Sequence, residues 1–418
     1  MRVLMVSWEY PPVVIGGLGR HVHALARELT AAGHEVVVLS RHPAGTDAET
    51  HPTCDERTPD GVRVLRVAED PAHLEFARDM VAWTLAMGHA MVRAALTRLT
   101  DWRPDVVHAH DWLVAHPSIA LADVLDVPLV ATVHATEAGR FNGWLSSPVS
   151  RQVHSTEWWL AHRADTVITC SAAMRTEVAE LFDLDPEPIE VLHNGIEPRG
   201  WRVPRARVRA ARDRFAPDGA PLLLYFGRLE YEKGCHDLIA ALPRIRRAHP
   251  GTRLLLAGTG TAADMLIETA RTHRVRRSVA FLGHLSDPDL AALLCAVDAV
   301  VLPSRYEPFG IVALEAAAAG APLVASAAGG LGDIVVDGVS GTSFPPGDVP
   351  GIARAVGTVL ADPRAAARRA RTARARLGVE FDWARIAAAT AAVYAAAPRG
   401  GSRDLARPKI PTGNVFGR

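Results

Sequence analysis

The segment from Glu307 to Glu315 places two carboxylates eight residues apart across a predicted junction between a loop and a helix. If the segment is helical, this spacing covers roughly 12 Å, because an α-helix rises about 1.5 Å per residue. That length resembles the reach from a sugar across a diphosphate to a ribose, so each carboxylate is predicted to bind hydroxyls at one end. The amides of Gly310 and Ile311, with Phe309 beside them, are predicted to bind the diphosphate at the helix start. An isolated pair of glutamates at this spacing is also typical of a surface helix and its cap, so the interpretation depends on the rest of the chain.

Two cations, Arg228 and Lys233, follow a predicted strand from Pro221 to Phe226. A leaving diphosphate gains negative charge as a glycosidic bond breaks, and cations placed on it stabilise that transition state more than the ground state. Such a pair can replace a metal. Arginine and lysine are common in solvated loops, but a position at the carboxyl end of a strand favours a functional role.

Glycines follow the first predicted strand of the chain. The run Gly16-Gly17-Leu18-Gly19 precedes a predicted helix from His21 to Thr30, so its backbone amides are placed to approach a phosphate. A tight turn without a ligand is the alternative. The glycine spacing, and Ser40 and Arg41 at the end of the second strand, disfavour a nicotinamide dehydrogenase.

Histidines and an aspartate end two further strands of the first half of the chain. His134 is predicted to hydrogen-bond a sugar hydroxyl, and Asp111 to accept a hydrogen bond from one. His108 is predicted to be buried with its hydrogen bonds satisfied. His108 and His110, two residues apart, hint at a metal, but the neighbouring sequence offers no clear third ligand, so no metal site is predicted.

Composition bounds the class of protein. A chain of 418 residues, 49% of them hydrophobic, is predicted to form two domains. Lysine and arginine number 46, as do aspartate and glutamate, which gives no reason to expect nucleic acid as a partner. The four cysteines are far apart in sequence, which argues against a zinc site or a disulfide framework and favours a reducing cytoplasm. The apolar run at Met1 to Val6 is too short for a signal peptide or a membrane span and predicts a buried strand.

Short runs of Val, Ile and Leu alternate with amphipathic stretches, which predicts an α/β protein with parallel sheets. This pattern starts again after a turn at 193–198, so we expect two doubly wound domains, residues 1–195 and 196–380, with ligands in the cleft between them. A last helix is expected at about 383–397, and a disordered tail at 398–418. The strands are expected at 3–7, 35–39, 62–67, 105–109, 129–133, 166–169 and 189–192, then at 221–226, 253–257, 279–282, 299–302 and 323–325.

Together these residues resemble the retaining glycosyltransferases of the GT-B fold, which have two facing Rossmann-like domains. The resemblance covers roughly residues 1–397 and lies in family four, near the bacterial glycogen synthases. The chain is further similar to mycobacterial α-(1→4)-glucosyltransferases that elongate glycogen and methylglucose lipopolysaccharide. The motifs that carry the resemblance are Trp8 to Val22, Val81 to Met91, His108 to Trp112, the pair Arg228 and Lys233, and Tyr306 to Ala319.

The resemblance implies a donor-binding second domain. Glu307 would bind sugar hydroxyls near the reaction centre, Glu315 the ribose, and Gly310 and Ile311 the diphosphate. Arg228 and Lys233 would neutralise the leaving group. The nucleotide base would lie against Gly283, His284 and Leu285.

It also implies an acceptor-binding first domain, onto which the last helix returns. Gly17, next to Gly16, would contribute an amide to the donor, His134 would contact the sugar, and Asp111 would shape the acceptor-facing pocket. The family needs no divalent metal and no other cofactor.

The activity implied is transfer of glucose from UDP-glucose or ADP-glucose to the non-reducing end of an α-(1→4)-glucan. The acceptor would be glycogen or an acylated methylglucose oligosaccharide, the precursor of methylglucose lipopolysaccharide. A mannosyltransferase, a sugar-nucleotide epimerase and a glycan-binding protein without catalysis remain alternatives. No integral membrane segment is expected, although the arginine-rich stretch Arg364 to Arg376 leaves peripheral contact with an anionic membrane open. The sequence does not indicate an oligomeric state.

Overall fold

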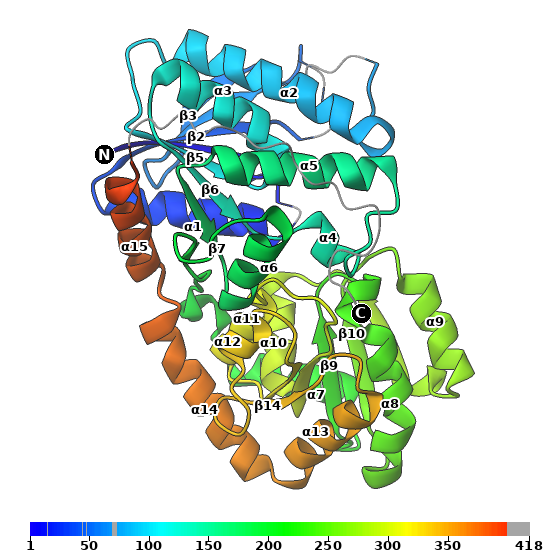
Figure 1. Cartoon of the computed structure of the whole chain (residues 1–418). Helices are drawn as coiled ribbons and strands as arrows, with labels where there is room; N and C mark the ends of the chain where they lie inside the picture. The colour runs from blue at the N-terminus through cyan, green and yellow to red at the C-terminus, as the bar shows by residue number, and fades with distance from the viewer. Residues whose placement is uncertain (15, 44, 47, 69–72, 399–418) are drawn as a thin grey trace. The chain divides into compact units, whose positions relative to one another are not determined.

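The computed structural model describes residues 1–398, apart from 15, 44, 47 and 69–72. Its contacts divide the chain into two compact units: unit 1 is Met1–Asn194 with the chain from Trp383 onward, and unit 2 is Gly195–Asp382. In each unit helices cover a largely parallel sheet, as predicted (Figure 1). The predicted disorder of the tail falls, apart from Pro398, outside the described residues.

Unit 1 is built on an eight-stranded sheet in the order β3-β4-β2-β1-β5-β6-β7-β8. The pairings are parallel except for β3 with β4, an antiparallel edge that carries charged residues in exposed positions. The inner strands are buried, which explains their continuous apolar runs. The strands are β1 (Arg2–Ser7), β2 (Glu35–Arg41), β3 (Cys54–Arg57), β4 (Arg63–Val67), β5 (Val106–His110), β6 (Leu129–Val133), β7 (Thr166–Thr169) and β8 (Glu190–Val191).

The last helix, α15, packs on the first helix, α1. Val22, Leu25 and Leu29 of α1 repeat at helical spacing and share a buried core with Trp383 and Ile386. Residues from the end of the chain therefore complete the core of unit 1. Its helices are α1 (Gly17–Ala31), α2 (Phe76–Arg98), α3 (Ala115–Leu125), α4 (Glu137–Arg140), α5 (Pro148–Arg163), α6 (Ala172–Phe182) and α15 (Trp383–Ala396), with a short 3₁₀ turn η1 (Trp112–Val114).

Unit 2 is built on a six-stranded parallel sheet in the order β11-β10-β9-β12-β13-β14. Its strands are β9 (Leu222–Phe226), β10 (Arg253–Ala257), β11 (Val279–Gly283), β12 (Ala299–Leu302), β13 (Leu323–Ser326) and β14 (Thr342–Phe344). Its helices are α7 (Arg205–Phe215), α8 (Cys235–Ala248), α9 (Ala263–Thr272), α10 (Asp287–Ala296), α11 (Ile311–Ala319), α12 (Leu331–Ile334), α13 (Val349–Ala361) and α14 (Pro363–Glu380), with 3₁₀ turns η2 (Pro198–Trp201), η3 (Tyr231–Lys233) and η4 (Arg276–Ser278).

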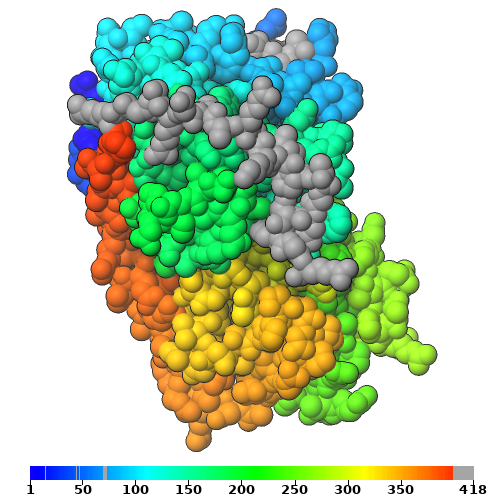
Figure 2. All heavy atoms as spheres, viewed as in Figure 1, coloured from blue at the N-terminus to red at the C-terminus, as the bar shows by residue number. Residues whose placement is uncertain are grey.

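The arginine-rich stretch forms α14, whose buried residues are Ala366, Ala370, Ala373 and Leu377. Small residues thus face the unit, while most of the arginines lie outside. Figure 2 shows this part of the chain, in orange, at the surface of unit 2. Among the described residues, the helices lack the combination of length and apolar character needed to cross a membrane.

Candidate functional site

In each unit the strand order reverses beside the strand that comes first in that unit. In unit 1, β1 lies between β2 and β5, and in unit 2, β9 lies between β10 and β12. Ligands of such sheets bind at the carboxyl ends of the strands on either side of the reversal, where the two connections leave in opposite directions. The candidate residues lie at the ends of these strands: Gly16 and Gly17 come after β1, His110 ends β5 and Asp111 follows it, Arg228 and Lys233 come after β9, and Glu307 comes after β12.

In unit 2, the structure brings Lys233 and Glu307 into contact. The Lys233 Nζ atom lies 2.9 Å from Glu307 Oε2, and both side chains are mostly buried, with 13% and 12% of their surfaces exposed. The Ser304 hydroxyl donates a second hydrogen bond, of 3.3 Å, to the same carboxylate oxygen. The carboxylate is therefore held in one position while part of it still faces solvent.

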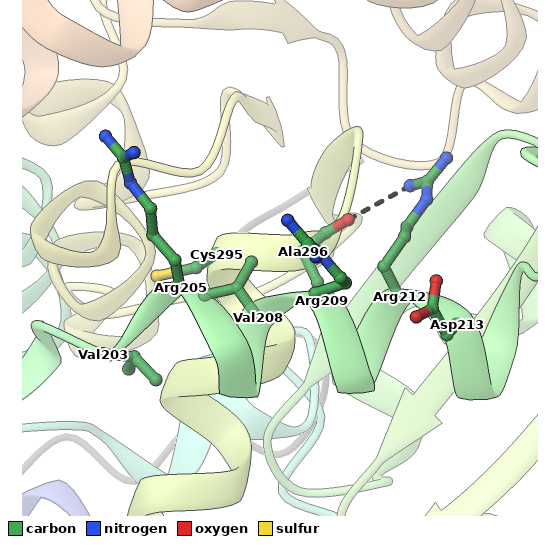
Figure 3. A pocket seen from close by; sticks show the side chains of 8 residues that line it. All are labelled: Val203, Arg205, Val208, Arg209, Arg212, Asp213, Cys295 and Ala296. Atoms are coloured by element: carbon green, nitrogen blue, oxygen red, sulfur yellow. Dashed lines mark hydrogen bonds between the residues drawn. The ribbon is translucent and has the colours of Figure 1, made fainter.

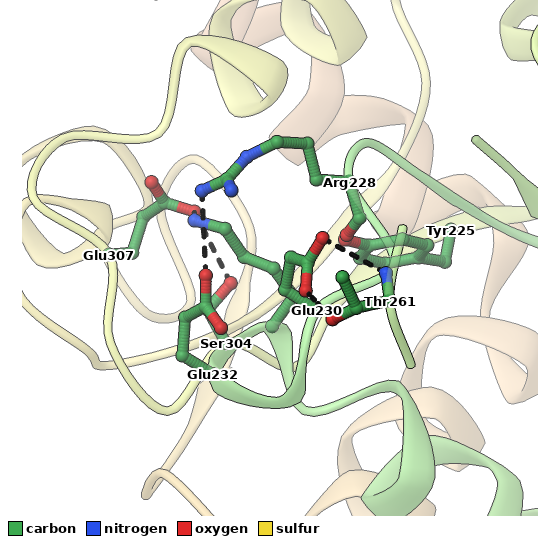
Figure 4. Close-up of polar contacts among 8 residues, drawn as sticks. Tyr225, Arg228, Glu230, Glu232, Thr261, Ser304 and Glu307 are labelled. Carbon is green, nitrogen blue, oxygen red and sulfur yellow. Dashed lines mark hydrogen bonds and ion pairs between the residues drawn. The ribbon is translucent and has the colours of Figure 1, made fainter. Parts of the chain in front are cut away.

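Arg228 approaches the same place from the loop after β9. Its Nη2 atom lies 3.4 Å from Glu232 Oε1, and 51% of the arginine side chain is exposed. Figure 4 shows the side chains of Arg228, Glu232 and Glu307 converging on one space. An exposed guanidinium held only by a long ion pair can turn toward an anionic ligand at little cost.

The loops that carry these groups are tied together. Arg305 donates two hydrogen bonds, of 2.8 and 2.9 Å, to the buried Asp237 carboxylate. The amides of Arg305 and Tyr306 both donate to the Glu232 carbonyl oxygen. The loop before Glu307 is thus fixed against the turn that carries Lys233, which accounts for the short ion pair between the two.

Glycines let the loops approach closely. A Cβ atom on Gly329, whose φ is +50°, would lie 2.1 Å from the Glu307 carbonyl oxygen, and one on Gly330 would lie 2.5 Å from Phe309 Cα. Gly310 has a φ of +104°, and a Cβ atom there would lie 2.6 Å from Leu331. The glycine turn after β13 therefore packs directly under the Glu307 loop.

The helix that contains Glu315, α11, begins later than expected, so the segment from Glu307 to Glu315 is only partly helical. It starts at Ile311, with Gly310 as an N-cap that has no side-chain hydrogen bond, so only the part from Ile311 to Glu315 rises as a helix. Because Gly310 has no side chain to cap the helix, the first backbone amides of α11 can donate hydrogen bonds to an anion. Glu315 is buried, with 4% exposed. Phe309 is also buried and packs edge-on against Phe381, with ring centroids 6.1 Å apart. Its side chain therefore lies in the core, which leaves only its backbone for contact with a nucleotide-sugar donor.

Gly283, His284 and Leu285 lie at the carboxyl end of β11, on the same edge of the sheet as Glu307. The Gly283 carbonyl accepts a 2.7 Å hydrogen bond from the Gly258 amide, and His284 is exposed. Two strands, β10 and β9, separate them from β12. The predicted base-binding residues thus lie at the far side of this edge from Glu307, the predicted sugar-binding glutamate.

In unit 1, Glu9 orders the glycine turn after β1. Its carboxylate accepts a 3.1 Å hydrogen bond from the Gly16 amide, and a Cβ atom on Gly19 would lie 3.1 Å from the same side chain. The helix starts at Gly17, earlier than the predicted His21, and its N-cap residue is Gly16, which has no side chain to cap it.

Three histidines form what we call the histidine cluster: His21, His110 and His134. One nitrogen of each lies within 4.8 Å of the others, and His110 Nδ1 is 3.2 Å from His134 Nε2. Burial lowers the pKa of His21 and His110 well below the usual value, and that of His134 to about 3, so all three are neutral at neutral pH. His21 Nδ1 lies 2.6 Å from the Asn194 amide oxygen, which can only accept, so this nitrogen carries the proton.

The histidine cluster corrects one step of the sequence argument. The sequence near His110 shows no third metal ligand, but folding supplies His21 from α1 and His134 from the loop after β6. Neutral imidazoles are metal ligands, so the cluster has the donors a transition metal requires. His108 is a core histidine, as predicted: Tyr394 and Thr132 each hydrogen-bond one of its ring nitrogens at 2.7 Å.

Asp111 joins β5 to β6. Its backbone has a positive φ of 64° with ψ at 172°, outside the left-handed helical region, and its carboxylate accepts a 2.7 Å hydrogen bond from the His134 amide. Burial raises the pKa of Asp111 to about 6, against the lowering effect of the hydrogen bonds and of Arg140. Asp111 and His134 are therefore held together as one structural element.

A hollow of about 520 Å³ lies elsewhere on unit 2, between α7 and α10. Figure 3 shows Arg205, Arg209 and Arg212 beside it, with Arg212 bonded to the Ala296 carbonyl oxygen. Arg212 also pairs with Asp298, which precedes β12. The hollow is thus at the amino ends of the strands, opposite the edge that carries Glu307.

Comparisons with known proteins agree with this geometry. Residues 15–199 match the model of the family described as Glycosyltransferase Family 4, and residues 209–376 match that of Glycosyl transferases group 1. A glycogen synthase of Mycobacterium tuberculosis is 60% identical over 417 residues, covering 98% of each chain. An alpha-maltose-1-phosphate synthase of the same species is 31% identical, covering 94% of this chain and 99% of the relative. Among solved structures, the sucrose-phosphate synthase of Thermosynechococcus elongatus is similar with a TM-score of 0.79 and 25% identity, covering 94% of this chain and 98% of that one.

Proposed function

We propose, since the chain belongs to the glycosyltransferases of group 1 and family 4, that it transfers glucose from a nucleotide-glucose to the non-reducing end of an α-(1→4)-glucan. The observation that carries this proposal is the Lys233–Glu307 pair beside the uncapped start of α11, at the point where the strand order reverses. The relative that is 60% identical over nearly the whole chain is named a glycogen synthase, which supports glucose as the sugar and a glucan as the acceptor.

In this proposal unit 2 binds the donor. The amides at Gly310 and Ile311 hold the diphosphate, Arg228 and Lys233 neutralise the charge that develops on it, and Glu307 positions the sugar hydroxyls. Glu315 binds the ribose, and the loop at Gly283 receives the base. Because Glu307 already pairs with Lys233, its role is positioning and electrostatics.

Unit 1 binds the acceptor. The Gly17 amide and His134 contact the donor sugar, and Asp111 accepts a hydrogen bond from an acceptor hydroxyl. The acceptor attacks from the side of the departing phosphate, which takes the proton, so the anomeric configuration is retained without a protein nucleophile. The side chains assigned here include two cations for the leaving group, and we therefore propose a reaction that needs no divalent metal.

We further propose glycogen or an acylated methylglucose oligosaccharide as acceptor, UDP-glucose or ADP-glucose as donor, and the cytoplasm as location. The four cysteines Cys54, Cys170, Cys235 and Cys295 lie far apart in the sequence, which supports a reducing compartment. Fractionation with a cytoplasmic marker tests the location.

Nucleoside diphosphate release from UDP-glucose, ADP-glucose and GDP-mannose, with a maltooligosaccharide acceptor and EDTA, tests the activity. We expect acceptor-dependent release from a glucose donor, lost in Glu307→Ala and kept in Glu268→Ala, an exposed glutamate on α9. Release only from GDP-mannose would change the sugar to mannose. Conversion of a sugar nucleotide without release would indicate an epimerase, and glucan binding without release would indicate a binding protein.

A further inference from the structure

Two large aromatic side chains are exposed on the loop that follows the histidine-bearing strand end of unit 1. Phe141 has 54% and Trp144 has 55% of its surface exposed, just after the short helix α4. They are among the most exposed large apolar residues of the part of the chain that the structure describes. Aromatic rings exposed together on one turn offer apolar faces to a ligand.

The loop that carries them is rigid by its own hydrogen bonds. The Gly143 amide donates to the Ala138 carbonyl at 2.7 Å, and the Trp144 amide donates to the Phe141 carbonyl at 3.1 Å. Asn142 and Gly143, with φ at +53° and +84°, make the turn between the two aromatic residues. Phe141 and Trp144 thus lie on one turn whose conformation is set when the protein folds, so ligand binding costs little further conformational entropy there.

Buried polar contacts attach this loop to the candidate site. The Glu157 carboxylate, 4% exposed, accepts a 2.8 Å hydrogen bond from the Glu137 amide. The Ser150 hydroxyl donates to the Glu137 side chain at 2.8 Å, and Thr136 caps α4 through the Gly139 amide at 2.9 Å. Thr136 lies two residues after His134. The aromatic turn is therefore continuous with the element that holds His134 and Asp111.

The surroundings of the two rings suit a hydroxyl-rich ligand. Arg140 and Asn142 are exposed beside them and offer hydrogen-bond donors. A pyranose ring has an apolar C–H face that fits an aromatic ring and a rim of hydroxyls that fits such donors. The diphosphate and base have their own groups in unit 2, which leaves the acceptor as the ligand for this surface.

We propose that Phe141 and Trp144 form an acceptor subsite that binds glucose units of an α-(1→4)-glucan chain beyond the unit that receives the new sugar. This inference rests on the proposed function, because it takes the glucan as the acceptor. The subsite would distinguish long acceptors from short ones, because a chain must span from the reaction centre to the aromatic turn to contact both rings.

Kinetics of Phe141→Ala and Trp144→Ala with maltotriose and with glycogen test the proposal. Loss of one aromatic contact is expected to raise KM for glycogen roughly three- to tenfold. The KM for the nucleotide donor and the rate with maltotriose should stay within twofold of wild type. Trp144→Phe should keep most of the glycogen affinity that Trp144→Ala loses, and Val124→Ala, at an even more exposed site on α3, should match wild type.

Affinity electrophoresis of the same variants in glycogen-containing gels separates this inference from the proposed function. If wild type is retarded by glycogen but transfers no glucose, and the aromatic variants are not retarded, the subsite stands and the proposed activity fails. If wild type transfers glucose and both alanine variants keep its glycogen KM and retardation, the subsite is overturned. Equal loss with maltotriose and glycogen would also overturn it, since that marks a general effect on the fold.

Discussion

Replacing Asp111 with asparagine should make the protein more stable and less active. Burial raises the pKa of this carboxyl from 3.8 to about 6, so at neutral pH the fold holds an ionised group that it would hold more easily as the neutral acid. Asparagine is neutral, its amide oxygen can accept the bond from the His134 amide, and it has the same shape at Cβ as the aspartate that it replaces, so it adds no backbone strain. The charge would be removed with its surroundings intact.

The size of the effect follows from the shift in pKa. A change of about 2 units, at about 1.4 kcal/mol per unit, costs the folded state at most about 3 kcal/mol at pH 7.5. The pKa of Asp111 is higher in the folded state than in the unfolded state. The contribution of Asp111 to the free energy of unfolding is therefore highest below about pH 4, where the carboxyl is protonated in both states, and falls as pH rises to about 6. The gain from Asp111→Asn should therefore be about half as large at pH 5 and vanish below pH 4.

Urea unfolding followed by circular dichroism at pH 7.5 and pH 5 measures the gain, and nucleoside diphosphate release measures the activity. Asp111→Ala is the control: it loses the hydrogen bond and places alanine at a φ of +64°, so it should be less stable than wild type at both pH values. A gain that is the same at both pH values, or a loss of stability at pH 7.5, would refute the argument from the buried charge.

Three further outcomes are expected. Glu307→Gln should lower turnover about 100-fold or more while the protein stays folded, since it removes the carboxylate that lies 2.9 Å from Lys233. Wild-type turnover in this variant would contradict the role of Glu307, and thermal melting curves check that the variant is folded. Gly329→Ala should destabilise unit 2 by about 1–3 kcal/mol and lower turnover, because its Cβ atom would meet the Glu307 carbonyl at 2.1 Å; Gly332→Ala, with no atom within 4 Å of the added methyl group, is the matched control in the same thermal melts. EDTA should leave the rate unchanged; loss of activity restored by Zn²⁺ would instead place a required metal at the histidine cluster.

The fold could be predicted to the level of strands and class, but not to strand order. Apolar runs marked the buried strands because both faces of a parallel sheet are covered. The edge strand Cys54–Arg57 and the short strand Thr342–Phe344 were missed, since the first is charged and exposed and the second is too short for a pattern. The order β2-β1-β5 and β10-β9-β12, which brings the candidate residues together, depends on long-range pairing that no local pattern encodes.

The sequence predicted individual residues of the candidate site but not which of them contact one another. Strand-end logic selected Lys233 and Glu307 separately, but their ion pair depends on Arg305 and the buried Asp237, which no motif marks. His21 was taken only as the start of a helix, although a histidine one turn after the glycine run was a usable signal. Its meeting with His134, more than a hundred residues away, required the sheet.

The division of the chain has a consequence for how the protein is made. Unit 2 is one uninterrupted stretch inserted into unit 1, whose core also contains Trp383, Ile386 and Tyr394. On a ribosome, unit 2 can finish folding before unit 1, although it is synthesised after most of it. Unit 1 has to wait with an apolar face of α1 uncovered until the final helix emerges. A truncated chain that ends at Asp382 should have a folded unit 2 and an incompletely folded unit 1 that aggregates.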